Sequence, residues 1–281
     1  MKPHIDLLVI HLEMPLTQLF VLTERGTTLF AEERLSEIIS LLNSAGKLKV
    51  KELSSRFSVT EDCIRKDLKI LENQGHLKRT YGGAVQIRES ANNYDIRSRK
   101  EINVPSKTII AEKAFGIILD RETIFLDLST TNILLAKLLA GSAKKVTVVT
   151  NTLEILNILC SQNNITVVAT GGILNKNLLG FTGAATIELI SRYKFDKSFI
   201  GSCGVDAFDK NITTFDIDDG ITKKAIIEAS KKSYLVMENN KFHFDGNYKF
   251  ATLDDIDCII IDELPDSEII KILEDSNIKL L

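Results

Sequence analysis

The sequence predicts an α/β protein made of two domains: a small helical domain near the N-terminus and a larger domain built around a mostly parallel sheet. Three observations support this prediction. The chain has 281 residues, which is enough for two domains of ordinary size. Residues 31–87 are charged and carry short helical patterns. From residue 106 onward, short β-rich runs alternate with helical stretches, as they do in doubly wound parallel sheets.

Two helices are predicted at the start of the small domain. Leu35, Ile38 and Leu42 recur at a spacing that puts them on one face of a helix. Gly46 then ends that helix, because glycine readily takes the positive φ of a C-terminal cap. The next run, KVKELSSRF, has two apolar residues four positions apart and predicts a second helix.

A third helix and a β-hairpin complete the small domain. Thr60 can cap the third helix, and two acidic residues follow in its first turn, where the helix dipole favours them. Its apolar stripe consists of Ile64, Leu68 and Leu71, and Gly75 ends it. The run HLKRTYGGAVQI predicts two short strands joined by a turn at the Gly-Gly pair. This order of elements predicts a winged helix-turn-helix over residues 31–87.

The small domain is basic within a chain whose formal net charge is -3. Residues 45–83 hold nine Lys/Arg against five Asp/Glu. On the third helix, arginine can read guanine edges in the major groove and lysine can meet phosphates, while the hairpin follows the DNA backbone. A solvated charged face on a small helical domain is the alternative interpretation. The predicted DNA-binding residues are Thr60, Asp62, Arg65, Lys66, Lys69, Lys78, Arg79, Tyr81, Gly82 and Gly83.

Two further segments flank the small domain. Residues 1–30 are moderately apolar, and we interpret them as an N-terminal extension of unknown role without a signal peptide. They are either a packing extension or the product of an upstream start codon that the cell does not use. Residues 88–105 are polar, lack periodicity and end at Pro105, so we predict a linker there. Residues 106–281 then form the larger domain.

Six strands are predicted in the larger domain, and helical runs separate them. Several of the strand sequences are apolar throughout rather than alternating, which is typical of strands that are covered on both faces. The sheet should therefore lie between two layers of helices. The predicted strands are residues 123–127, 145–151, 164–170, 197–204, 233–238 and 257–263.

Polar residues gather where these strands end. Asp127 closes one strand, and three hydroxyl residues follow it at the start of a helix, which is a favourable place for an anion. Ordinary helix capping is the alternative interpretation. Carboxylates for sugar hydroxyls, hydroxyls and amides for phosphate, and a lysine for charge suit a phosphorylated sugar or polyol. The predicted effector-binding residues are Asp127, Ser129, Thr130, Thr131, Asn151, Gly171, Gly172, Asp206 and Lys241.

The composition argues against several other classes of protein. The four cysteines lie far apart without a CxxC pair, and the four histidines are scattered without an HExxH motif. We therefore expect no disulfide framework, no metal site and no cofactor. No apolar run approaches the ~18–20 residues of a membrane-spanning helix. Unpaired thiols without a membrane segment predict a cytoplasmic protein.

The small domain resembles a known family. Four elements stand in order: VTEDCIRKDL at residues 59–68, Leu-Glu at 71–72, Gly at 75 and RTYGGA at 79–84. Together they resemble the N-terminal hallmark of the DeoR family of bacterial transcriptional regulators. Cys63, Lys66 and Tyr81 stand where that hallmark has Thr, Arg and His. Lys66 keeps the charge but loses the bidentate fork of arginine, which leaves readout at that position open.

The larger domain resembles the effector domain of the same family. The matching elements are Asp127 with Thr130 and Thr131, Val-Thr-Asn at 149–151, Gly-Gly at 171–172, GSCGVD at 201–206, Lys223, and Lys-Phe at 241–242. The resemblance adds Lys223 to the effector-binding set and implies a domain similar to ribose-5-phosphate isomerase. Ser129 stands where Gly is usual, so either its Cβ narrows the loop or its hydroxyl adds a phosphate contact.

The resemblance implies a sequence-specific transcriptional regulator that represses a sugar or polyol catabolic operon. A phosphorylated sugar would release it from double-stranded operator DNA, and it would act as a homodimer or homotetramer. The alternative is an enzyme similar to sugar-phosphate isomerases with an added DNA-binding domain, in which Asp127, Asp206 or Glu238 would act as general base. The Lys-Gly-Gly-Gly run of those isomerases is missing. A third interpretation is an interaction module that does not bind DNA.

Overall fold

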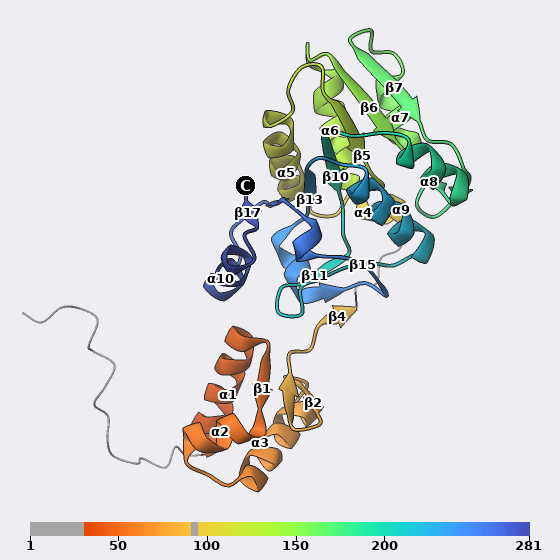
Figure 1. Ribbon diagram of the computed structural model, residues 1–281. Helices are drawn as coiled ribbons and strands as arrows, with labels where there is room; N and C mark the ends of the chain where they lie inside the picture. The colour runs from red at the N-terminus through yellow and green to blue at the C-terminus, as the bar shows by residue number, and fades with distance from the viewer. Residues whose placement is uncertain (1–30, 91–94) are drawn as a thin grey trace, which may run out of the picture. The chain divides into compact units, whose positions relative to one another are not determined.

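The computed structural model describes residues 31–90 and 95–281 and divides into two compact units (Figure 1). One unit comprises most of residues 31–85, and the other comprises residues 86–281 together with the short turn at 43–46. The extension predicted for residues 1–30 lies outside the described residues. We describe each unit separately.

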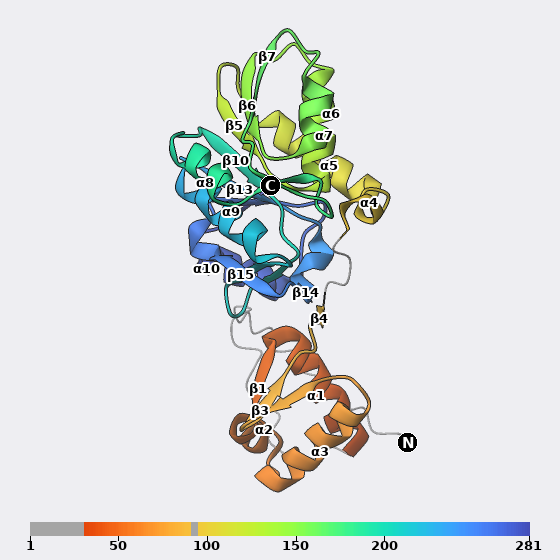
Figure 2. The same ribbon diagram turned by 90° about the vertical axis from the view of Figure 1, so that its right-hand side faces the viewer.

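The N-terminal unit has the three helices and the hairpin that the sequence predicts. Its strands form a small antiparallel sheet in the order β1-β3-β2 (Figure 2). The strand β1 was not predicted, because three residues with one apolar side chain give no usable pattern. The elements are α1 (Ala31–Ala45), β1 (Lys47–Lys49), α2 (Val50–Phe57), α3 (Glu61–Asn73), β2 (Lys78–Thr80) and β3 (Gly83–Val85).

A tight turn joins α2 to α3. Ser58 takes a left-handed conformation with φ 53°, and the Ser54 hydroxyl donates to the Val59 carbonyl at 2.6 Å. Thr60 then caps α3 by accepting from the Cys63 N–H at 3.2 Å, as predicted. The apolar faces of the helices and the small sheet meet in one core, made of Ile38, Leu42, Leu48, Val50, Leu53, Ile64, Leu68, Leu71, Leu77 and Ala84.

A buried ion pair links α1 to α3 inside this core. Arg34 Nε donates to Asp67 at 2.6 Å and Arg34 Nη2 donates to its other carboxylate oxygen at 3.1 Å. The side chains are only 9% and 6% exposed, and hydrogen bonding to Asp67 raises the pKa of Arg34. The sequence prediction had put Leu35 on the buried face, but Leu35 is half-buried and Arg34 lies inside. The reason is its partner, which lies 33 residues away in sequence.

The C-terminal unit is built on a parallel sheet of seven strands in the order β17-β16-β13-β10-β5-β6-β7. Each of the six predicted strands is present, and β17 adds an edge strand. The order runs one way from β5 to β7 and the other way from β10 to β17, so a topological switch point lies between β5 and β10. The strands are β5 (Thr123–Leu126), β6 (Val146–Thr150), β7 (Ile165–Ala169), β10 (Lys197–Ile200), β13 (Ser233–Val236), β16 (Cys258–Ile260) and β17 (Lys279–Leu280).

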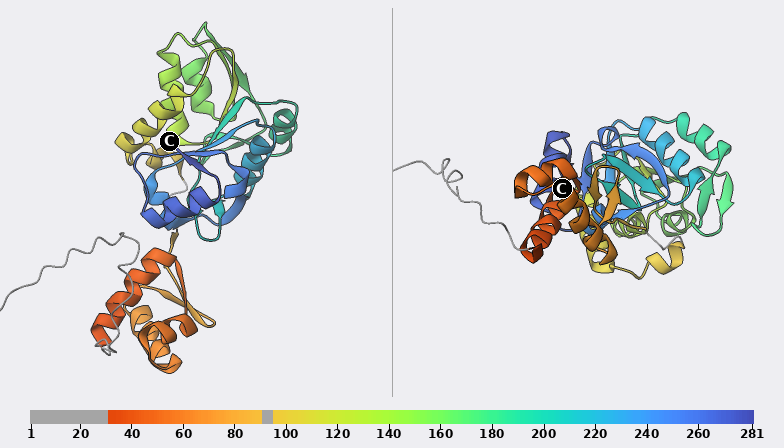
Figure 3. Two further views of the ribbon diagram at one scale, coloured as in Figure 1. Left: turned by 60° about the vertical axis from the view of Figure 1, so that its left-hand side comes forward. Right: turned by 90° about the horizontal axis from the view of Figure 1, so that it is seen from below.

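Helices cover both faces of this sheet, as Figure 3 shows. One apolar cluster contains Ile110 of α5, Leu135 of α6 and Ile155 of α7. A second cluster contains residues of α8, α9 and α10. The predicted doubly wound arrangement is therefore confirmed. The helices are α5 (Val104–Gly116), α6 (Thr130–Ala140), α7 (Leu153–Leu159), α8 (Ala184–Ser191), α9 (Ile217–Glu228) and α10 (Ser267–Asp275).

Smaller elements surround one end of the sheet. An antiparallel sheet has the order β11-β12-β15, and two-stranded pairs form between β8 and β9 and between β14 and β4. Short 3-10 helices, η1 and η2, follow β13 and β15. The bounds are β8 (Ile173–Asn175), β9 (Gly180–Thr182), β11 (Gly204–Asp206), β12 (Asn211–Thr214), η1 (Asn239–His243), β14 (Phe244–Asp245), β15 (Tyr248–Thr252) and η2 (Leu253–Asp255).

The segment predicted as a linker, residues 88–105, packs on the C-terminal unit over its described part. The backbone of β4 (Glu89–Ser90) pairs with β14, and the short helix α4 (Ile96–Arg99) buries Ile96 in the core. Arg88 donates to the carbonyl oxygens of three residues at 2.7 to 2.8 Å and pairs with Asp245 at 2.8 Å. These partners lie over a hundred residues away, so the polar sequence of the segment could not reveal them.

We expect the substitution Asp67→Leu to destabilise the N-terminal unit by about 3–5 kcal/mol, because it leaves the charge of Arg34 buried without a partner. Amide hydrogen exchange in α1 and α3 of the full chain measures this loss. The double variant R34M/D67L should recover most of the protection, since it removes both charges. A double variant as labile as the single one would contradict this explanation.

Candidate functional site

The N-terminal unit presents a basic surface on α3 and on the hairpin of β2 and β3. Arg65, Lys66 and Lys69 are exposed on α3, on the side opposite its buried apolar stripe. Lys78 and Arg79 are exposed on β2, and Tyr81 at the hairpin turn is fully exposed. This arrangement brings together the predicted DNA-binding side chains, and an exposed basic helix beside a basic hairpin suits DNA.

Carboxylates already engage two of these arginines. Arg65 pairs with Asp62 at 2.7 Å and with Glu61 at 2.6 Å, both in the first turn of α3. Arg79 pairs with Glu72 at 2.6 Å. Among the residues that the structure describes, Lys66 and Lys69 make no ion pair. The two lysines can therefore meet phosphates directly, whereas the guanidinium of Arg65 is oriented by acidic neighbours.

The two glycines of the hairpin have separate structural roles. Gly82 has φ +94°, a conformation that glycine takes without strain. Gly83 lies against β1 so closely that a Cβ there would overlap the carbonyl oxygen of Leu48. The hairpin itself therefore requires both residues. A close approach of this turn to DNA stays a prediction.

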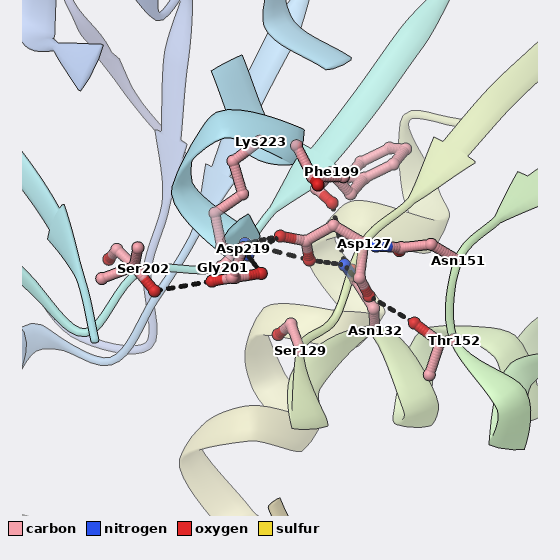
Figure 4. A network of polar contacts seen from close by, with 12 residues as sticks. Asp127, Ser129, Asn132, Asn151, Thr152, Phe199, Gly201, Ser202, Asp219 and Lys223 are labelled. Carbon is pink, nitrogen blue, oxygen red and sulfur yellow. Dashed lines mark hydrogen bonds and ion pairs between the residues drawn. The ribbon is translucent and has the colours of Figure 1, made fainter. Parts of the chain in front are cut away.

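The C-terminal unit has a buried polar centre at its topological switch point, shown in Figure 4. The Asp127 carboxylate is completely buried after β5. It accepts from the Gly201 N–H at 3.0 Å and from Asn132 Nδ2 at 2.7 Å, and it pairs with the Lys223 ammonium. Asp219 lies 3.4 Å from the same ammonium. Burial opposes the charge of Lys223, but the two carboxylates outweigh it and raise its pKa.

Helix α6 begins beside this centre. Ser129 caps the helix, because its hydroxyl accepts from the Thr131 N–H at 3.2 Å. Its Cβ packs against Gly201, where an added Cβ would lie only 2.8 Å from it. The Cβ of Ser129 therefore fills space beside Gly201, and the hydroxyl keeps its own O–H free to donate while it caps the helix. Both predicted roles of this serine, narrowing the loop and contacting phosphate, stay predictions. Thr130, the next residue, lines a pocket.

Two adjoining pockets form one cleft in the C-terminal unit. The first adjoins the polar centre, reaching Lys223, Asp219 and Thr214. The second, with a volume of about 180 Å³, extends outward past Lys107 and Glu238. The residues that line both are Arg99, Thr130, Ser202, Cys203, Phe215 and Lys241. The cleft thus lies at the carboxyl ends of the central strands, where ligands of α/β sheets bind.

Four of the predicted effector-binding residues line this cleft: Ser129, Thr130, Lys223 and Lys241. Asp127 lies behind them and acts through Lys223. The structure places the other five predicted residues outside the cleft walls. They are Thr131, Asn151, Gly171, Gly172 and Asp206.

Three of the five have partners elsewhere in the C-terminal unit. Asn151 donates to the Phe181 carbonyl at 3.1 Å, and Gly171 accepts from the Thr186 hydroxyl at 2.6 Å. Asp206 caps the turn after β11 and lies 3.6 Å from Arg88. Position at a strand end put these residues on the predicted list, but the cleft covers only part of that edge of the sheet. Their role in effector binding stays a prediction.

Sequence reasoning missed two cations of the cleft, Arg99 and Lys107. Both lie in or beside the segment predicted as a linker, where no motif marks them. The pKa of Lys107 is lowered to about 8, mainly by burial and in smaller part by the nearby Lys241 and Arg99, while Glu238 opposes the shift. Lys241 donates to the Ser202 carbonyl at 2.8 Å and lies 3.5 Å from Glu238. The cleft therefore presents several positive groups to an anion.

A basic helix with a hairpin in one unit and a polar cleft in an α/β sheet in the other define a DNA-binding regulator with a ligand-sensing domain. The family model described as the DeoR-like helix-turn-helix domain matches residues 34–90. The model described as the DeoR C terminal sensor domain matches residues 102–263. The protein belongs to the DeoR family of transcriptional regulators, which confirms the resemblance seen in the sequence.

Relatives of full length support this assignment. The chain is 34% identical over 251 residues to the uncharacterized HTH-type transcriptional regulator YulB of Bacillus subtilis, covering 88% of this chain and 95% of the relative. It is 31% identical over 248 residues to the glycerol-3-phosphate regulon repressor of Escherichia coli, covering 88% and 97%. The names and the family place this protein among regulators rather than enzymes, so the isomerase-like alternative is set aside.

Solved structures also align with part of this chain. Ribose 5-phosphate isomerase A from Methanocaldococcus jannaschii aligns at 14% identity and a TM-score of 0.36, covering 48% of this chain and 52% of that chain.

Within residues 31–90 and 95–281, no helix combines the length and apolar character needed to cross a membrane.

We expect sulfate binding in the cleft to weaken as the pH rises through 8. The ammonium of Lys107 attracts an anion, and its protonated fraction falls about tenfold between pH 7 and 9, which limits the loss of affinity to about tenfold. The charged groups that face it are Glu238, Lys241 and Arg99. Sulfate is a suitable probe because its own charge is constant in this range.

Calorimetric titration at both pH values measures this effect. The variant Lys107→Gln should bind sulfate more weakly at pH 7 and lose most of the pH dependence. An equal pH dependence in wild type and variant would rule out Lys107 as the titrating group.

Proposed function

We propose that this regulator represses a sugar or polyol catabolic operon and leaves its operator when a phosphorylated sugar binds in the cleft of the sensor domain. The observation that carries this proposal is the cleft itself, which combines the start of α6 with several cations at the switch point of the sheet. The similarity to a glycerol-3-phosphate regulon repressor supports both repression and a phosphorylated effector.

The chemistry of the cleft fits a phosphate joined to a hydroxylated carbon chain. The Thr130 hydroxyl at the start of α6 and the ammonium of Lys241 suit phosphate oxygens, because helix N-termini and cations both favour anions. Asp219 adds a carboxylate that can accept from sugar hydroxyls. The outer part of the cleft, with a volume of about 180 Å³, suits a small metabolite.

The basic surface of the N-terminal unit fits operator DNA. Helix α3 would enter the major groove with Arg65 near base edges, while Lys66, Lys69 and Lys78 would meet phosphates. The acidic balance of the whole chain, with net charge -3, supports a focused contact rather than general attraction to DNA. We also propose a homodimer or homotetramer, because helix-turn-helix regulators read paired half-sites.

Release then follows from linkage between two sites. A phosphosugar that binds one arrangement of the protein more tightly shifts the population toward it, and the operator favours the other arrangement. A hundredfold difference in effector affinity between the two arrangements corresponds to about 2.7 kcal/mol of coupling per subunit.

A binding screen combined with an operator assay tests this function. The panel consists of glycerol 3-phosphate, dihydroxyacetone phosphate, fructose 1-phosphate, fructose 6-phosphate, glucose 6-phosphate and ribose 5-phosphate, each with its unphosphorylated counterpart. Genomic fragments that the protein retains supply the operator. We expect at least one phosphorylated compound, and not its counterpart, to stabilise the protein and release it from the fragment. Release by none of them would contradict the proposal.

Replacing Arg65 by Ala should weaken specific operator binding by about 1–3 kcal/mol, because a bidentate contact to a base edge is lost. Binding to random-sequence DNA is the control and should change little. Fluorescence anisotropy at fixed salt measures both. An equal loss on the two DNAs would show that Arg65 contacts phosphate only.

Replacing Thr130 by Val should weaken phosphosugar binding about tenfold or more, since a hydrogen bond to a charged group contributes ~1.5–3 kcal/mol. Operator affinity without effector should not change. Thr131→Val is the matched control, because Thr131 is buried and lies outside the cleft. If the Thr130 variant binds the effector as tightly as wild type, the assignment of Thr130 fails.

A further inference from the structure

The segment that follows the N-terminal unit contributes a wall of the cleft. Arg99, the last residue of α4, lines both parts of the cleft, and Ile102 and Asn103 line the outer part. In sequence, Arg99 lies only 14 residues after Val85, where the last strand of the N-terminal unit ends. A ligand in the cleft would thus touch the connection between the DNA-binding unit and its sensor.

The backbone at Arg99 is firmly held. The Lys107 ammonium donates to the carbonyl oxygens of Arg99 and Ile102, each at 2.6 Å. Ile96 is 1% exposed, and its N–H donates to the Asn177 carbonyl at 3.1 Å. The anchored backbone fixes the position from which the side chain of Arg99 reaches the cleft, so little backbone freedom is lost on binding.

Within the described residues, Arg99 differs from the other cations of the cleft because no partner is bonded to its side chain. Lys107 forms no ion pair either, but its ammonium donates to two backbone carbonyl oxygens. Lys223 is matched by the carboxylates of Asp127 and Asp219, and Lys241 is matched by Glu238. Within the described residues, the side chain of Arg99 has no ion pair, and its Nε is buried without a hydrogen-bond partner. A buried donor of a charged group that lacks an acceptor costs free energy. A bound anion would supply that acceptor and so remove the cost.

We propose that Arg99 binds the anionic group of the effector and thereby joins the effector to the segment that leads to the DNA-binding unit. The proposal rests on the function proposed above and assigns its regulatory contact. A guanidinium offers two parallel donors to a phosphate, and such charge-assisted pairs are among the stronger hydrogen bonds in proteins.

A second anchor lies on the same segment. Arg88 donates to the carbonyl oxygens of Phe242 and Phe244, which flank His243 at the end of η1. Lys241, also in η1, lines the cleft. An anion drawn between Arg99 and Lys241 would therefore act on the segment at α4 and, through η1, at Arg88. Both anchors belong to the segment that leads to the DNA-binding unit, so an effector that changed either contact would act on that segment.

Two variants on α4 form the test. Arg99→Gln removes the charge at the cleft, and Arg97→Gln removes an exposed charge two residues away on the same helix. Inorganic phosphate and the phosphosugar panel are titrated into wild type and both variants, and operator release is followed with each compound. We expect R99Q to bind inorganic phosphate and the active phosphosugar about tenfold or more weakly and to stay on the operator, with its operator affinity unchanged.

The other outcomes are informative as well. R97Q should behave like wild type, and R99K should lie between wild type and R99Q, because a lysine keeps the charge without the fork. If R99Q binds and responds like wild type, this inference fails while the proposed function stands. If wild type binds inorganic phosphate but no phosphosugar, and R99Q loses that binding, the inference stands and the proposed function fails. Binding of neither by wild type would overturn both.

Discussion

The buried carboxylate of Asp127 is the interaction on which the sensor domain depends. A charge removed from water is tolerated only when partners surround it, and here the partners come from three different elements. Gly201 follows β10, Asn132 belongs to α6, and Lys223 belongs to α9. The need to satisfy one carboxylate therefore brings these elements together at the switch point of the sheet. The positive charge of Lys223 is neutralised by Asp127 and Asp219. An anionic ligand must therefore bind mainly to other cations of the cleft.

The N-terminal unit uses the same principle in a smaller core. Arg34 and Asp67 connect α1 with α3 through two hydrogen bonds that water hardly reaches. The motif that marks the DNA-binding helix in the sequence thus contains residues of two kinds. Asp67 and the apolar stripe hold the helix in place, whereas Arg65 and Lys66 lie exposed on its surface. In the sequence, Asp67 looks like one more charged residue on the surface of a basic helix. In the structure it is part of the core.

The connecting segment could transmit the proposed effector signal, because it lines the cleft and leads to the DNA-binding unit. Residues 86–107 do not merely join two units, because their described part packs on the sensor and places a cation in its cleft. Burial of Ile96 and the bonds of Arg88 and Lys107 resist displacement of this segment. In the proposed regulation, a ligand that adds contacts to this segment would shift the protein toward the arrangement that it binds more tightly, and coupling between two sites is typically about 1–3 kcal/mol. The proposed effector thus needs no separate relay to reach the connection.

The sequence by itself determined the local features of this protein. Helical periodicity, the Thr60 cap and the Gly-Gly turn predicted the winged helix-turn-helix, and apolar strand runs predicted the covered parallel sheet. Hydroxyl residues at the start of α6 marked one wall of the cleft. Only the tertiary structure decided which strand ends meet, so Ser129, Thr130, Lys223 and Lys241 gather while Asn151 and Asp206 lie elsewhere. It also brought in Arg99 and Lys107, because contacts between residues far apart in sequence leave no periodic pattern within it.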